Sequence, residues 1–376
     1  MPWPLLIEAA LKIGILIFLV ILPAVALSVY AERRVSAIIQ DRVGPNRVGL
    51  PLTLFGAKKD WAFFGLFQPA ADGLKFILKE DVTPGHVNRF YYWLAPVLVM
   101  VPALLTCAVL PFGSTLELPF VGRPIPMVIA NLDVGILFVF AISSLGVYGI
   151  VLAGWSSNSK YPFLGGVRSS SQMISYEISL GLSVVPMLMI YGDLNLVRIS
   201  EYQNTYGWAL LPLSSNPLGF GWKGLLLWIP ILISFVVFIV SLFAETNRLP
   251  FDLPECETEL VAGYHTEYSS MKFALFFLGE YAAMLIGAGF AVTLFLGGWS
   301  LPFGLGLTGD QGLLAGLLNI ATFFAKVALF LLFFIWVRWS LPRFRYDQLM
   351  RLGWVYFFEI ALINIFLTAG ILLWLR

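Results

Sequence analysis

The side chains best suited to chemistry are carboxylates crowded into "AETNRLPFDLPECETELVAGYHTEY", which runs from Ala244 to Tyr268. Carboxylates at such close spacing titrate as a group, which suits the storage and relay of protons. Docking of a basic partner is the alternative, but Leu260 and Val261 between the acids argue against a freely solvated loop. The segment contains one arginine, Arg248. It also contains six of the chain's 22 acidic residues: Glu245, Asp252, Glu255, Glu257, Glu259 and Glu267.

Two further acids lie inside apolar stretches, where a charge costs a few kcal/mol or more and is by default a functional hypothesis. Glu280 lies nine residues into one stretch, roughly 14 Å along a helix. Glu177 lies about five residues into another. Because a buried carboxylic acid can exchange a proton near neutral pH, we expect both in a proton path. Lys326, midway along a third stretch, is either the counter-ion of Glu280 or part of that path.

Three other charged residues in apolar stretches have simpler interpretations. Glu8 and Lys12 are one helical turn apart, a spacing that predicts a local ion pair. Glu359 is expected to form a structural ion pair or to contact a neighbouring subunit. None of the three is assigned to the proton path.

The composition is that of a membrane protein, with 59% hydrophobic and only 12% charged residues, against about 25% charged in a typical soluble domain. Isolated strands would leave their amides unpaired in lipid, so each apolar stretch long enough to cross a bilayer must be a helix. The sequence therefore predicts an all-α polytopic membrane protein in which residues 1–376 form a single membrane domain. Eight transmembrane helices are expected, at residues 6–30, 91–112, 131–154, 172–192, 224–244, 271–297, 313–337 and 354–375.

Basic residues are distributed unevenly over the loops between these spans. Of the 23 lysines and arginines, 17 lie in loops 32–90, 155–171, 245–272 and 338–353, which share one side of the membrane. Positively charged loops stay cytoplasmic. We therefore expect both termini on the outer side, with the acidic segment and the long first loop together on the cytoplasmic side.

The first cytoplasmic loop carries two features of interest. Glu32, Arg33 and Arg34 follow the first span directly, where they would by themselves be a basic anchor on anionic lipid head groups. Further on, "LFQPAADGLKFILKED" mixes apolar and charged residues and predicts an interfacial amphipathic helix. Such a helix could frame a side entrance for a lipid-soluble substrate or serve as a plain surface anchor, and the residues leave both open.

Several well-known kinds of site are not encoded. The chain has only two cysteines, Cys107 and Cys256, and no CxxC, so it offers no iron–sulfur or zinc site of its own. "FGLGLTGD" has Gly304, Gly306 and Gly309 at dinucleotide-binding spacing, but no strand precedes it, so we reject this motif. We find no P-loop, and nothing indicates nucleic-acid binding.

Longer blocks of the sequence resemble one known family. "AERR", "DRVGPNRVG", "QPAADGLKFILKED", "SSSQMISYEISLGL", "AETNRLPFDLPECETELVAGYHTEYS" and "PRFRYDQLM" are similar to blocks of the H-subunit family of bacterial respiratory complex I. This family is the counterpart of mitochondrial NADH dehydrogenase subunit 1. The blocks occur in the family's order over about residues 28–352. The chain departs from the family in an insertion at 51–68, in Cys256 where glycine is common, and in a long segment 193–223 without assigned role.

The resemblance implies a membrane subunit of a proton-pumping NADH:quinone oxidoreductase, a translocase of the bacterial inner (plasma) membrane. Members of the family contribute to the quinone chamber, anchor the peripheral arm, and couple quinone reduction to proton translocation through an acidic relay. The substrate would be ubiquinone or menaquinone, whereas flavin, NADH and iron–sulfur clusters would be bound by other subunits. The implied partners are membrane lipids, the B and C/D subunits of the peripheral quinone site, the I subunit, and the small A, J and K membrane subunits.

Carried over by position, the resemblance assigns residues of this chain to two sites. Those of the quinone chamber are Glu32, Arg33, Arg34, Gln40, Arg42, Asp72, Arg343 and Arg345. Those of the proton relay are Glu177, Glu245, Arg248, Asp252, Glu255, Glu257, Glu259, Glu267 and Glu280. No metal site is implied, and no residue of this chain is expected to be catalytic by itself.

Two other functions would fit parts of the pattern. The membrane anchor of a membrane-bound hydrogenase or formate-linked complex would share much of the acidic segment but would need no long-tailed quinone. The close matches in the first loop favour the quinone enzyme. A stand-alone secondary transporter should show internal repeats or helices broken at the midplane, and the sequence shows neither.

Overall fold

The fold is helical almost throughout the part of the chain that the computed structural model describes. That part comprises residues 3–49, 61–117, 124–211, 222–253, 260–302 and 312–375. Within it, a short antiparallel hairpin is formed by β1 (Thr115–Glu117) and β2 (Pro124–Pro126). The predicted all-α fold class is confirmed.

Eight helical segments of the described chain are long and apolar enough to cross a membrane, as predicted. Three of them consist of two helices that continue one another. In chain order the helices are α1 (Trp3–Ile15) with α2 (Leu22–Ile39), α4 (Arg89–Thr106), α5 (Gly135–Ser143) with α6 (Leu145–Ser156), α7 (Lys160–Tyr191), α9 (Trp222–Glu245), α11 (Ser270–Phe295), α12 (Leu313–Ser340), and α13 (Tyr346–Arg351) with α14 (Phe358–Leu375).

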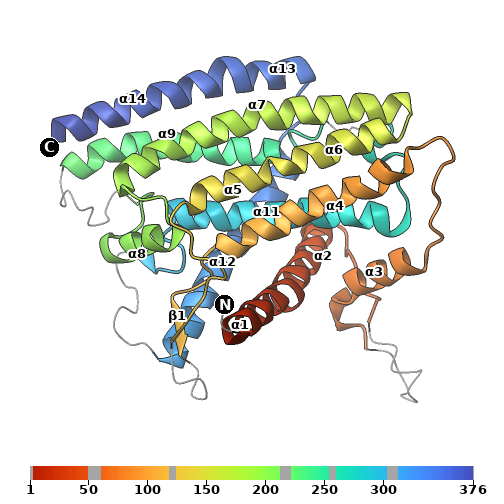
Figure 1. Cartoon of the computed structure of the whole chain (residues 1–376), viewed down its shortest axis with the longest axis horizontal. Coiled ribbons are helices and arrows are strands. Elements are labelled where there is room, and N and C mark those ends of the chain that lie inside the picture. Colours follow the sequence, from red (N-terminus) through yellow and green to blue (C-terminus); the bar gives the residue numbers. More distant parts are fainter. Residues whose placement is uncertain are drawn as a thin grey trace.

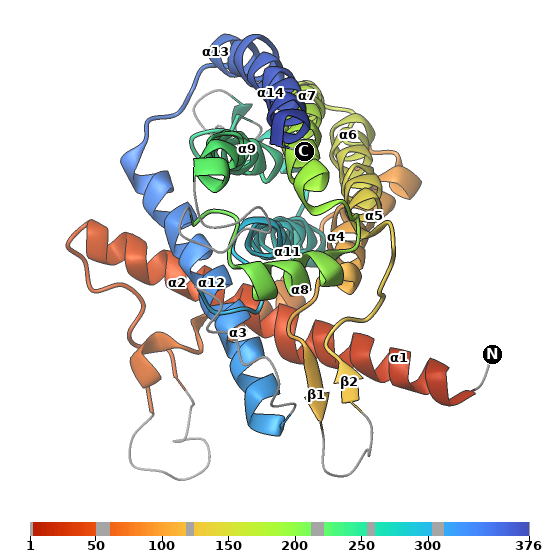
Figure 2. The same cartoon turned by 90° about the vertical axis from the view of Figure 1, so that its left-hand side faces the viewer.

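Helix α11 lies in the middle of the bundle (Figures 1 and 2). Helices α4, α9 and α12 pack against it, α7 packs on α6 and α9, and α14 covers α7 and α9 at one edge. The rod formed by α1 and α2 crosses the opposite edge. In the most apolar stretch of α11, 67% of the residues are buried, the largest share among the eight spans. Its neighbours therefore shield a charged residue in α11 from lipid.

Two of the predicted loops are shorter than expected. The first span continues as α2 to Ile39 instead of ending near residue 30, so Glu32 and the two arginines after it are helical. The loop predicted at 155–171 is mostly helix, because α7 already begins at Lys160. Hydropathy marks where a helix leaves the membrane, and a helix can continue into water beyond that point.

Helix α3 (Gln68–Leu78) occupies the position predicted for the amphipathic helix and forms a strap between α2 and α11. On the α2 side, the Arg33 guanidinium pairs with Asp72 at 2.7 Å. On the α11 side, the Ser270 hydroxyl donates to the Phe76 carbonyl at 2.8 Å. The presence of the helix is confirmed, and its location in a membrane interface stays a prediction.

The end of the bundle that carries the β1–β2 hairpin, which we call the far end, is covered by the short helix α8 (Leu196–Tyr206) (Figure 2). Buried Asn195 caps α8, because its side chain accepts hydrogen bonds from two amides of the first turn at 2.9 and 3.2 Å. The same side chain donates to Asn131 at 2.7 Å. Helix α8 lies in the segment 193–223, to which the sequence assigned no role.

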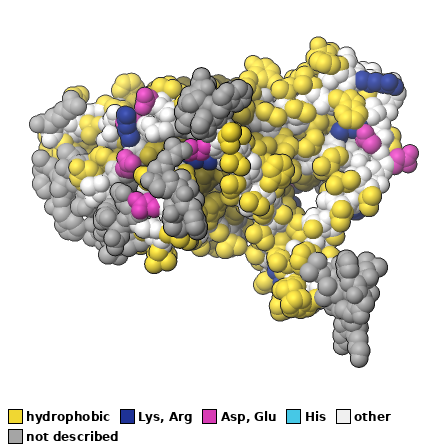
Figure 3. Space-filling model, turned by 60° about the horizontal axis from the view of Figure 1, so that its bottom comes forward, with side chains coloured by type: hydrophobic (Ala, Val, Ile, Leu, Met, Phe, Trp, Pro, Cys, Tyr) yellow, Lys and Arg dark blue, Asp and Glu magenta, His cyan; other side chains and the backbone are white. Residues whose placement is uncertain are grey.

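The face of the molecule in Figure 3 is largely apolar where its residues are described. On the face in Figure 3, broad areas of apolar side chains are interrupted by small groups of charged ones. Glu8 and Lys12 pair at 3.1 Å, which confirms the predicted local ion pair. Glu359 is exposed on α14, and its contact with a neighbouring subunit stays a prediction.

Candidate functional site

Four charged side chains and one tyrosine gather between α2, α11, α12 and the segment after α9, and we call them the charge cluster. Arg248 lies at its centre, with Nη1 3.3 Å from both carboxylate oxygens of Glu32 and Nε 2.7 Å from Oε1 of Glu280. The Arg248 guanidinium also lies 4.2 Å from the centroid of the Tyr281 ring. The fifth member, Arg338, pairs with Glu32.

The charge cluster is balanced in charge and largely buried. Two guanidinium groups face two carboxylates, and the side chains of Arg248, Glu32 and Glu280 are only 10 to 11% exposed. The Tyr281 hydroxyl adds a hydrogen bond to Glu32 at 2.5 Å. Buried ion pairs are favourable only when good geometry and additional hydrogen bonds offset desolvation. The cluster therefore depends on each of its four charged members, since removal of one leaves an uncompensated buried charge.

A polar cavity of about 320 Å³ adjoins the charge cluster, and we call it the cluster cavity. Besides the cluster, Arg33, Ser36, Phe277 and Trp339 line it. The Trp339 indole donates to the Ser36 hydroxyl at 2.6 Å, which joins α12 to α2 across the cavity wall. Among the described residues, no group of three or more His, Cys, Asp or Glu side chains is placed to hold a metal ion.

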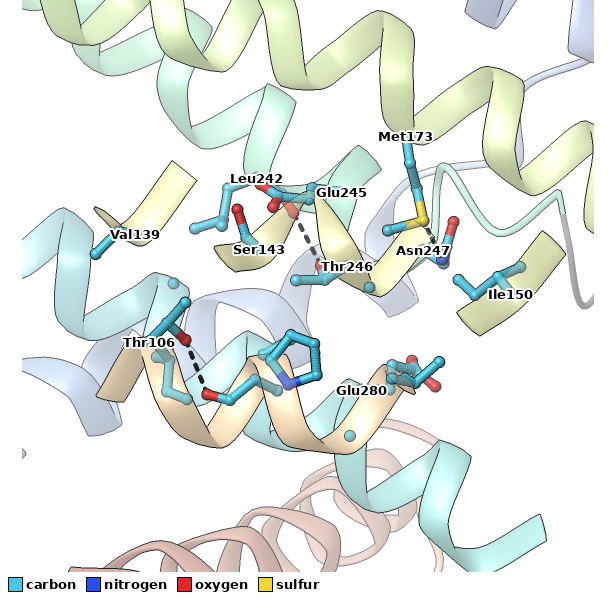
Figure 4. A pocket seen from close by; sticks show the side chains of 18 of the residues that line it. Thr106, Val139, Ser143, Ile150, Met173, Leu242, Glu245, Thr246, Asn247 and Glu280 are labelled. Carbon is cyan, nitrogen blue, oxygen red and sulfur yellow. Dashed lines mark hydrogen bonds between the residues drawn. The ribbon is translucent and has the colours of Figure 1, made fainter. Parts of the chain in front are cut away.

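A second cavity, of about 110 Å³, lies between α4, α5, α6, α9 and α11 (Figure 4), and we call it the internal cavity. It has room for several water molecules. Its walls are mostly apolar, with Ser143 and Glu245 on one side and Glu280 on the other (Figure 4). Glu280 therefore lines both cavities.

Two more of the predicted relay acids lie at the wall of the internal cavity and behind it. Glu245, the last residue of α9, lies beside Ser143 at the wall of the internal cavity (Figure 4). Glu177 on α7 is close enough to Glu245 for the two carboxylates to interact electrostatically. Three predicted relay acids thus form a sequence from the charge cluster to α7, in the order Glu280, Glu245 and Glu177.

The turn that carries Arg248 is held in place by Gln172, a completely buried residue of α7. The Gln172 amide nitrogen donates to the carbonyls of Ala244 and Phe251, at 2.8 and 2.7 Å. It also lies 3.2 Å from Oδ1 of Asn247. These bonds fix both ends of the turn from α9, so that Arg248 projects towards α2 and α11.

Four predicted chamber residues are not brought to the charge cluster. The Arg34 guanidinium donates to the Val43 carbonyl at 2.6 Å, within its own loop. Gln40 and Arg42 are exposed on that loop, and Arg345 is exposed after α12. The side chains of Gln40, Arg42 and Arg345 are therefore available to solvent or to partners.

The other predicted chamber residues form ion pairs. Asp72 pairs with Arg33, as described above, which ties α3 to α2 beside the cluster cavity. Arg343 pairs with Asp252 at 2.9 Å, so a predicted chamber residue contacts a predicted relay residue directly. This ion pair joins the segment after α12 to the segment after α9.

The end of the acidic segment is fixed to α4. The backbone carbonyl of Glu267 accepts a hydrogen bond from the Tyr92 hydroxyl at 2.6 Å, and the rings of Tyr92 and Tyr268 stack at 4.1 Å. The middle of the segment lies outside the described residues. The predictions that fall there, or in the other undescribed ranges, concern Glu255, Cys256, Glu257, Glu259, most of the 51–68 insertion and the glycines of 304–309.

Of the two alternatives that the sequence left open for Lys326, that of counter-ion to Glu280 is wrong. Glu280 pairs with Arg248, whereas the Lys326 ammonium donates to three backbone carbonyls of the turn after α11. Both residues lie near the middle of their own helices. Because α12 is tilted, however, its middle meets the end of α11 and not the middle (Figures 1 and 2).

Sequence reasoning missed three residues that the structure places in the site: Tyr281, Arg338 and Gln172. Tyr281 directly follows Glu280, so a polar ring beside a buried acid was a weak local signal. From the sequence alone, Arg338 is explained as one of the basic residues that follow a span on the cytoplasmic side. Gln172 carries no local signal, because its three acceptors lie more than 70 residues away along the chain.

His265, near the end of the acidic segment, predicts a pH dependence of stability. Burial lowers the pKa of His265 to about 4, whereas an unfolded histidine has a pKa of about 6.5. The unfolded chain therefore takes up this proton first as the pH falls, and up to about 3 kcal/mol is lost between about pH 6.5 and 4. We expect the melting temperature to fall from pH 7 to pH 5, and to fall less steeply in His265→Phe. An equal slope in the variant would assign the effect to another group.

Together, the fold and the site define a class of protein: a multi-pass helical membrane protein that holds a buried charge cluster beside two cavities joined by one glutamate. Comparison with known sequences identifies the family. A sequence model described as "NADH dehydrogenase" matches residues 12–369. The chain therefore belongs to the NADH dehydrogenase family.

Curated relatives are named as the H subunit of NADH-quinone oxidoreductase. The protein from Leptospira biflexa is 47% identical over 94% of this chain and 92% of its own length. The protein from Salinibacter ruber is 46% identical over 97% of this chain and 96% of its own. An H subunit from Cytophaga hutchinsonii, the one numbered 1, is 43% identical over 95% of this chain and 94% of its own. The similarity covers nearly the whole chain and confirms the resemblance seen in its motifs.

Proposed function

We propose that this chain is a membrane subunit of a proton-pumping NADH:quinone oxidoreductase, respiratory complex I. In this role it helps to form the quinone chamber, anchors the peripheral arm, and couples quinone reduction to proton translocation. The names of its relatives support this enzyme over the anchor of a hydrogenase or a stand-alone transporter. The substrate would be ubiquinone or menaquinone, and the redox groups would belong to partner subunits.

The observation that carries this proposal is the position of Glu280 between the two cavities. Its carboxylate is 2.7 Å from Arg248 on the side of the cluster cavity and lines the internal cavity on the other side. A carboxylate at such a junction can accept a proton on one side and release it on the other. Water in the two cavities would carry the proton to and from it.

The cluster cavity has the properties expected of one wall of a quinone site. Binding sites for small molecules combine apolar and aromatic walls with a few placed polar groups. Here the rings of Phe277 and Trp339 lie beside hydrogen-bond donors on Arg33, Ser36 and Arg338. The carbonyl oxygens of a quinone head group would accept hydrogen bonds from such donors.

Helix α3 supports an entrance from the lipid. It spans the gap between α2 and α11 beside the cluster cavity, where it exposes Leu74, Ile77 and Leu78 by 60, 65 and 83%. A helix with such an apolar face binds in the membrane interface. The long apolar tail of a quinone would then pass beneath α3, and its head group would reach the cavity.

The coupling mechanism follows from the two ion pairs of Arg248. Reduction of a quinone takes up protons and changes the charge beside the cluster. Because Arg248 holds Glu32 and Glu280 at once, a stronger contact with one weakens its contact with the other. Glu280 would then take up a proton and pass it through the internal cavity to Glu245 and Glu177. The family resemblance assigns Asp252, Glu255, Glu257, Glu259 and Glu267 to the same relay.

The exposed arginines would anchor the peripheral arm. Arg42 and Arg345 are exposed, and basic residues are concentrated in loops on this side. Complementary charge steers and orients partners more than it adds affinity. This arrangement suits contacts with the B and C/D subunits on the cytoplasmic side, and both termini would then face the outside of a bacterial inner membrane.

Glu280→Gln tests the proposal, because glutamine keeps the shape of the side chain but cannot carry a proton. In the assembled complex we expect proton pumping to be lost and quinone reduction to fall by roughly a hundredfold, the lower end of what a positioned proton-transfer group contributes. Pumping in proteoliposomes and NADH oxidation by the same preparation would be measured together.

The matched control is Glu359→Gln, which makes the same change on the exposed surface of another span. We expect this variant to pump and to reduce quinone like the unmodified complex. If assembled complex with Glu280→Gln pumps at an unchanged rate and stoichiometry, Glu280 is not part of the relay.

A further inference from the structure

Lys326 is a buried cation that the proposed relay does not use. It lies midway along α12 and is 7% exposed. Its ammonium donates to the carbonyls of Leu296, Gly298 and Ser300 at 2.7, 2.8 and 2.5 Å. All of its donors therefore point at the turn that follows α11, and its position is fixed.

The same turn receives helix α8 and the residues after it. The Trp208 ring lies 4.2 Å from the Lys326 ammonium, and its indole nitrogen donates to the Ser300 carbonyl at 3.2 Å. Gln203 of α8 donates to the Thr293 carbonyl at 2.8 Å and accepts from the Gly297 amide at 2.9 Å. Lys326 thus lies where α8, the end of α11 and α12 meet.

A continuous series of phenylalanine rings leads from the internal cavity to the part of α12 that carries Lys326. Phe140 and Phe290 line the cavity, with centroids 5.8 Å apart. Phe238 contacts both Phe290 and Phe295, at 5.7 and 5.4 Å. Phe235 then joins Phe295 to Phe330 of α12, at 5.2 and 6.4 Å. We call these six residues the phenylalanine series, and its last member lies one helical turn from Lys326.

This arrangement has the two elements that block ions in membrane proteins. Hydrophobic constrictions exclude water, and fixed positive charge raises the energy of protons and other cations. The carbonyls at the end of a helix would by themselves attract cations. The Lys326 ammonium donates to carbonyls of the turn directly after α11, so it places a positive charge beside the partial negative charge at the end of this helix.

We propose that the phenylalanine series and Lys326 form a barrier that closes the internal cavity towards the far end. Protons that enter the cavity past Glu280 then cannot cross this chain, and must leave sideways into neighbouring subunits or return. The inference rests on the proposed function in one respect, since it takes the internal cavity as part of a proton path. If the far end faces outward, as the loop charges predict, the barrier prevents leakage of pumped protons.

The barrier is tested by passive proton permeability in the absence of NADH. Lys326→Gln removes the charge and keeps an amide that can still donate to the carbonyls, whereas Lys326→Arg keeps the charge. A unit charge about 10 Å away changes the occupancy of a proton roughly tenfold at an effective dielectric constant of about 20. We therefore expect roughly tenfold faster proton entry per assembled Lys326→Gln complex, measured with a pH dye inside proteoliposomes, and little change for Lys326→Arg.

Lys12→Gln is the matched control, because Lys12 is also a lysine in a span but pairs with Glu8 on α1. It should leave the permeability unchanged. If the assembled Lys326→Gln complex has the same proton permeability as the unmodified complex, the charge of Lys326 is not part of the barrier. Should Lys326→Gln fail to assemble, Phe290→Ala decides the question, since it removes a ring of the series at the cavity wall and should also leak.

The double variant Lys326→Gln with Glu280→Gln separates this inference from the proposed function. If the leak of Lys326→Gln disappears in the double variant, protons reach the barrier through Glu280 and both proposals hold. A leak that persists supports the barrier but contradicts the route through Glu280. Absence of a leak in Lys326→Gln, together with loss of pumping in Glu280→Gln, would contradict the barrier and leave the relay standing.

Discussion

Arg248→Met is expected to have the largest effect of any single substitution in this chain. Methionine fills a similar volume but leaves Glu280 without its ion pair at 2.7 Å and removes one of the partners of Glu32. Breaking a buried ion pair by removing one partner costs about 3–5 kcal/mol. We expect little assembled complex on native gels, and quinone reduction per assembled complex close to background.

Two further variants show whether the planar guanidinium group of Arg248 or only its positive charge is required. Arg248→Lys keeps the positive charge, but a compact ammonium lacks the planar fork with which Arg248 reaches both carboxylates. It should assemble better than Arg248→Met and still couple poorly. Adding Glu280→Gln to Arg248→Met removes the carboxylate that Arg248→Met leaves unpaired. The amount of assembled complex should therefore recover in part. The effects of the two substitutions on assembly would then not be additive.

Arg198→Met is the control for the loss of an arginine. Arg198 belongs to neither proposed site, is 61% exposed and lies 3.2 Å from Asp193 in an ion pair, and exposed pairs of this kind contribute little. Its variant should assemble and retain most of its activity. Equal behaviour of the Arg248 and Arg198 variants would contradict the central role of the charge cluster.

Gln172→Leu is expected to have the second largest effect. The substitution removes the donor shared by the buried carbonyls of Ala244 and Phe251 and by Asn247. Each buried polar group left unsatisfied costs about 1–3 kcal/mol. The turn between them should therefore loosen, and the Arg248 side chain should lose its position. We expect faster hydrogen–deuterium exchange in residues 244–253 and reduced quinone reduction in complex that assembles.

Asn364→Leu is the matched control for Gln172→Leu. Asn364 is also a buried amide in a span, and it donates to the Pro230 carbonyl and to Ser234 at 3.0 and 2.9 Å. These contacts join α14 to α9, away from the charge cluster. The control should lower thermal stability without changing exchange in residues 244–253. If both variants leave that exchange unchanged, Gln172 does not hold the turn.

The features that could be predicted from the sequence are those set by local pattern. Each span is a continuous apolar stretch, and lipid forces such a stretch to be helical, so the number and order of spans followed directly. The pair of Glu8 and Lys12 is one helical turn apart and needed no tertiary information. The helix at Gln68–Leu78 could likewise be predicted from its own residues.

Motif matching identified most residues of the site but not which of them contact one another. It placed Glu32 and Asp72 in one site and Arg248 and Glu280 in another, whereas the structure joins Glu32, Arg248 and Glu280 in one cluster. A list of assigned residues carries no information about which side chains touch. That information requires the relative positions of α2, α11 and the segment after α9.

The sequence by itself therefore determined the membrane class, the spans and the residues that carry charge. Only the tertiary structure decided their partners. Arg248 meets Glu32 across 216 residues of chain, and Lys326 meets the turn after α11 instead of Glu280 because of the tilt of α12. The physical reason is that hydropathy and helical periodicity act over neighbouring residues. The partner of a buried charge is set by how whole helices tilt and pack, which no local pattern encodes.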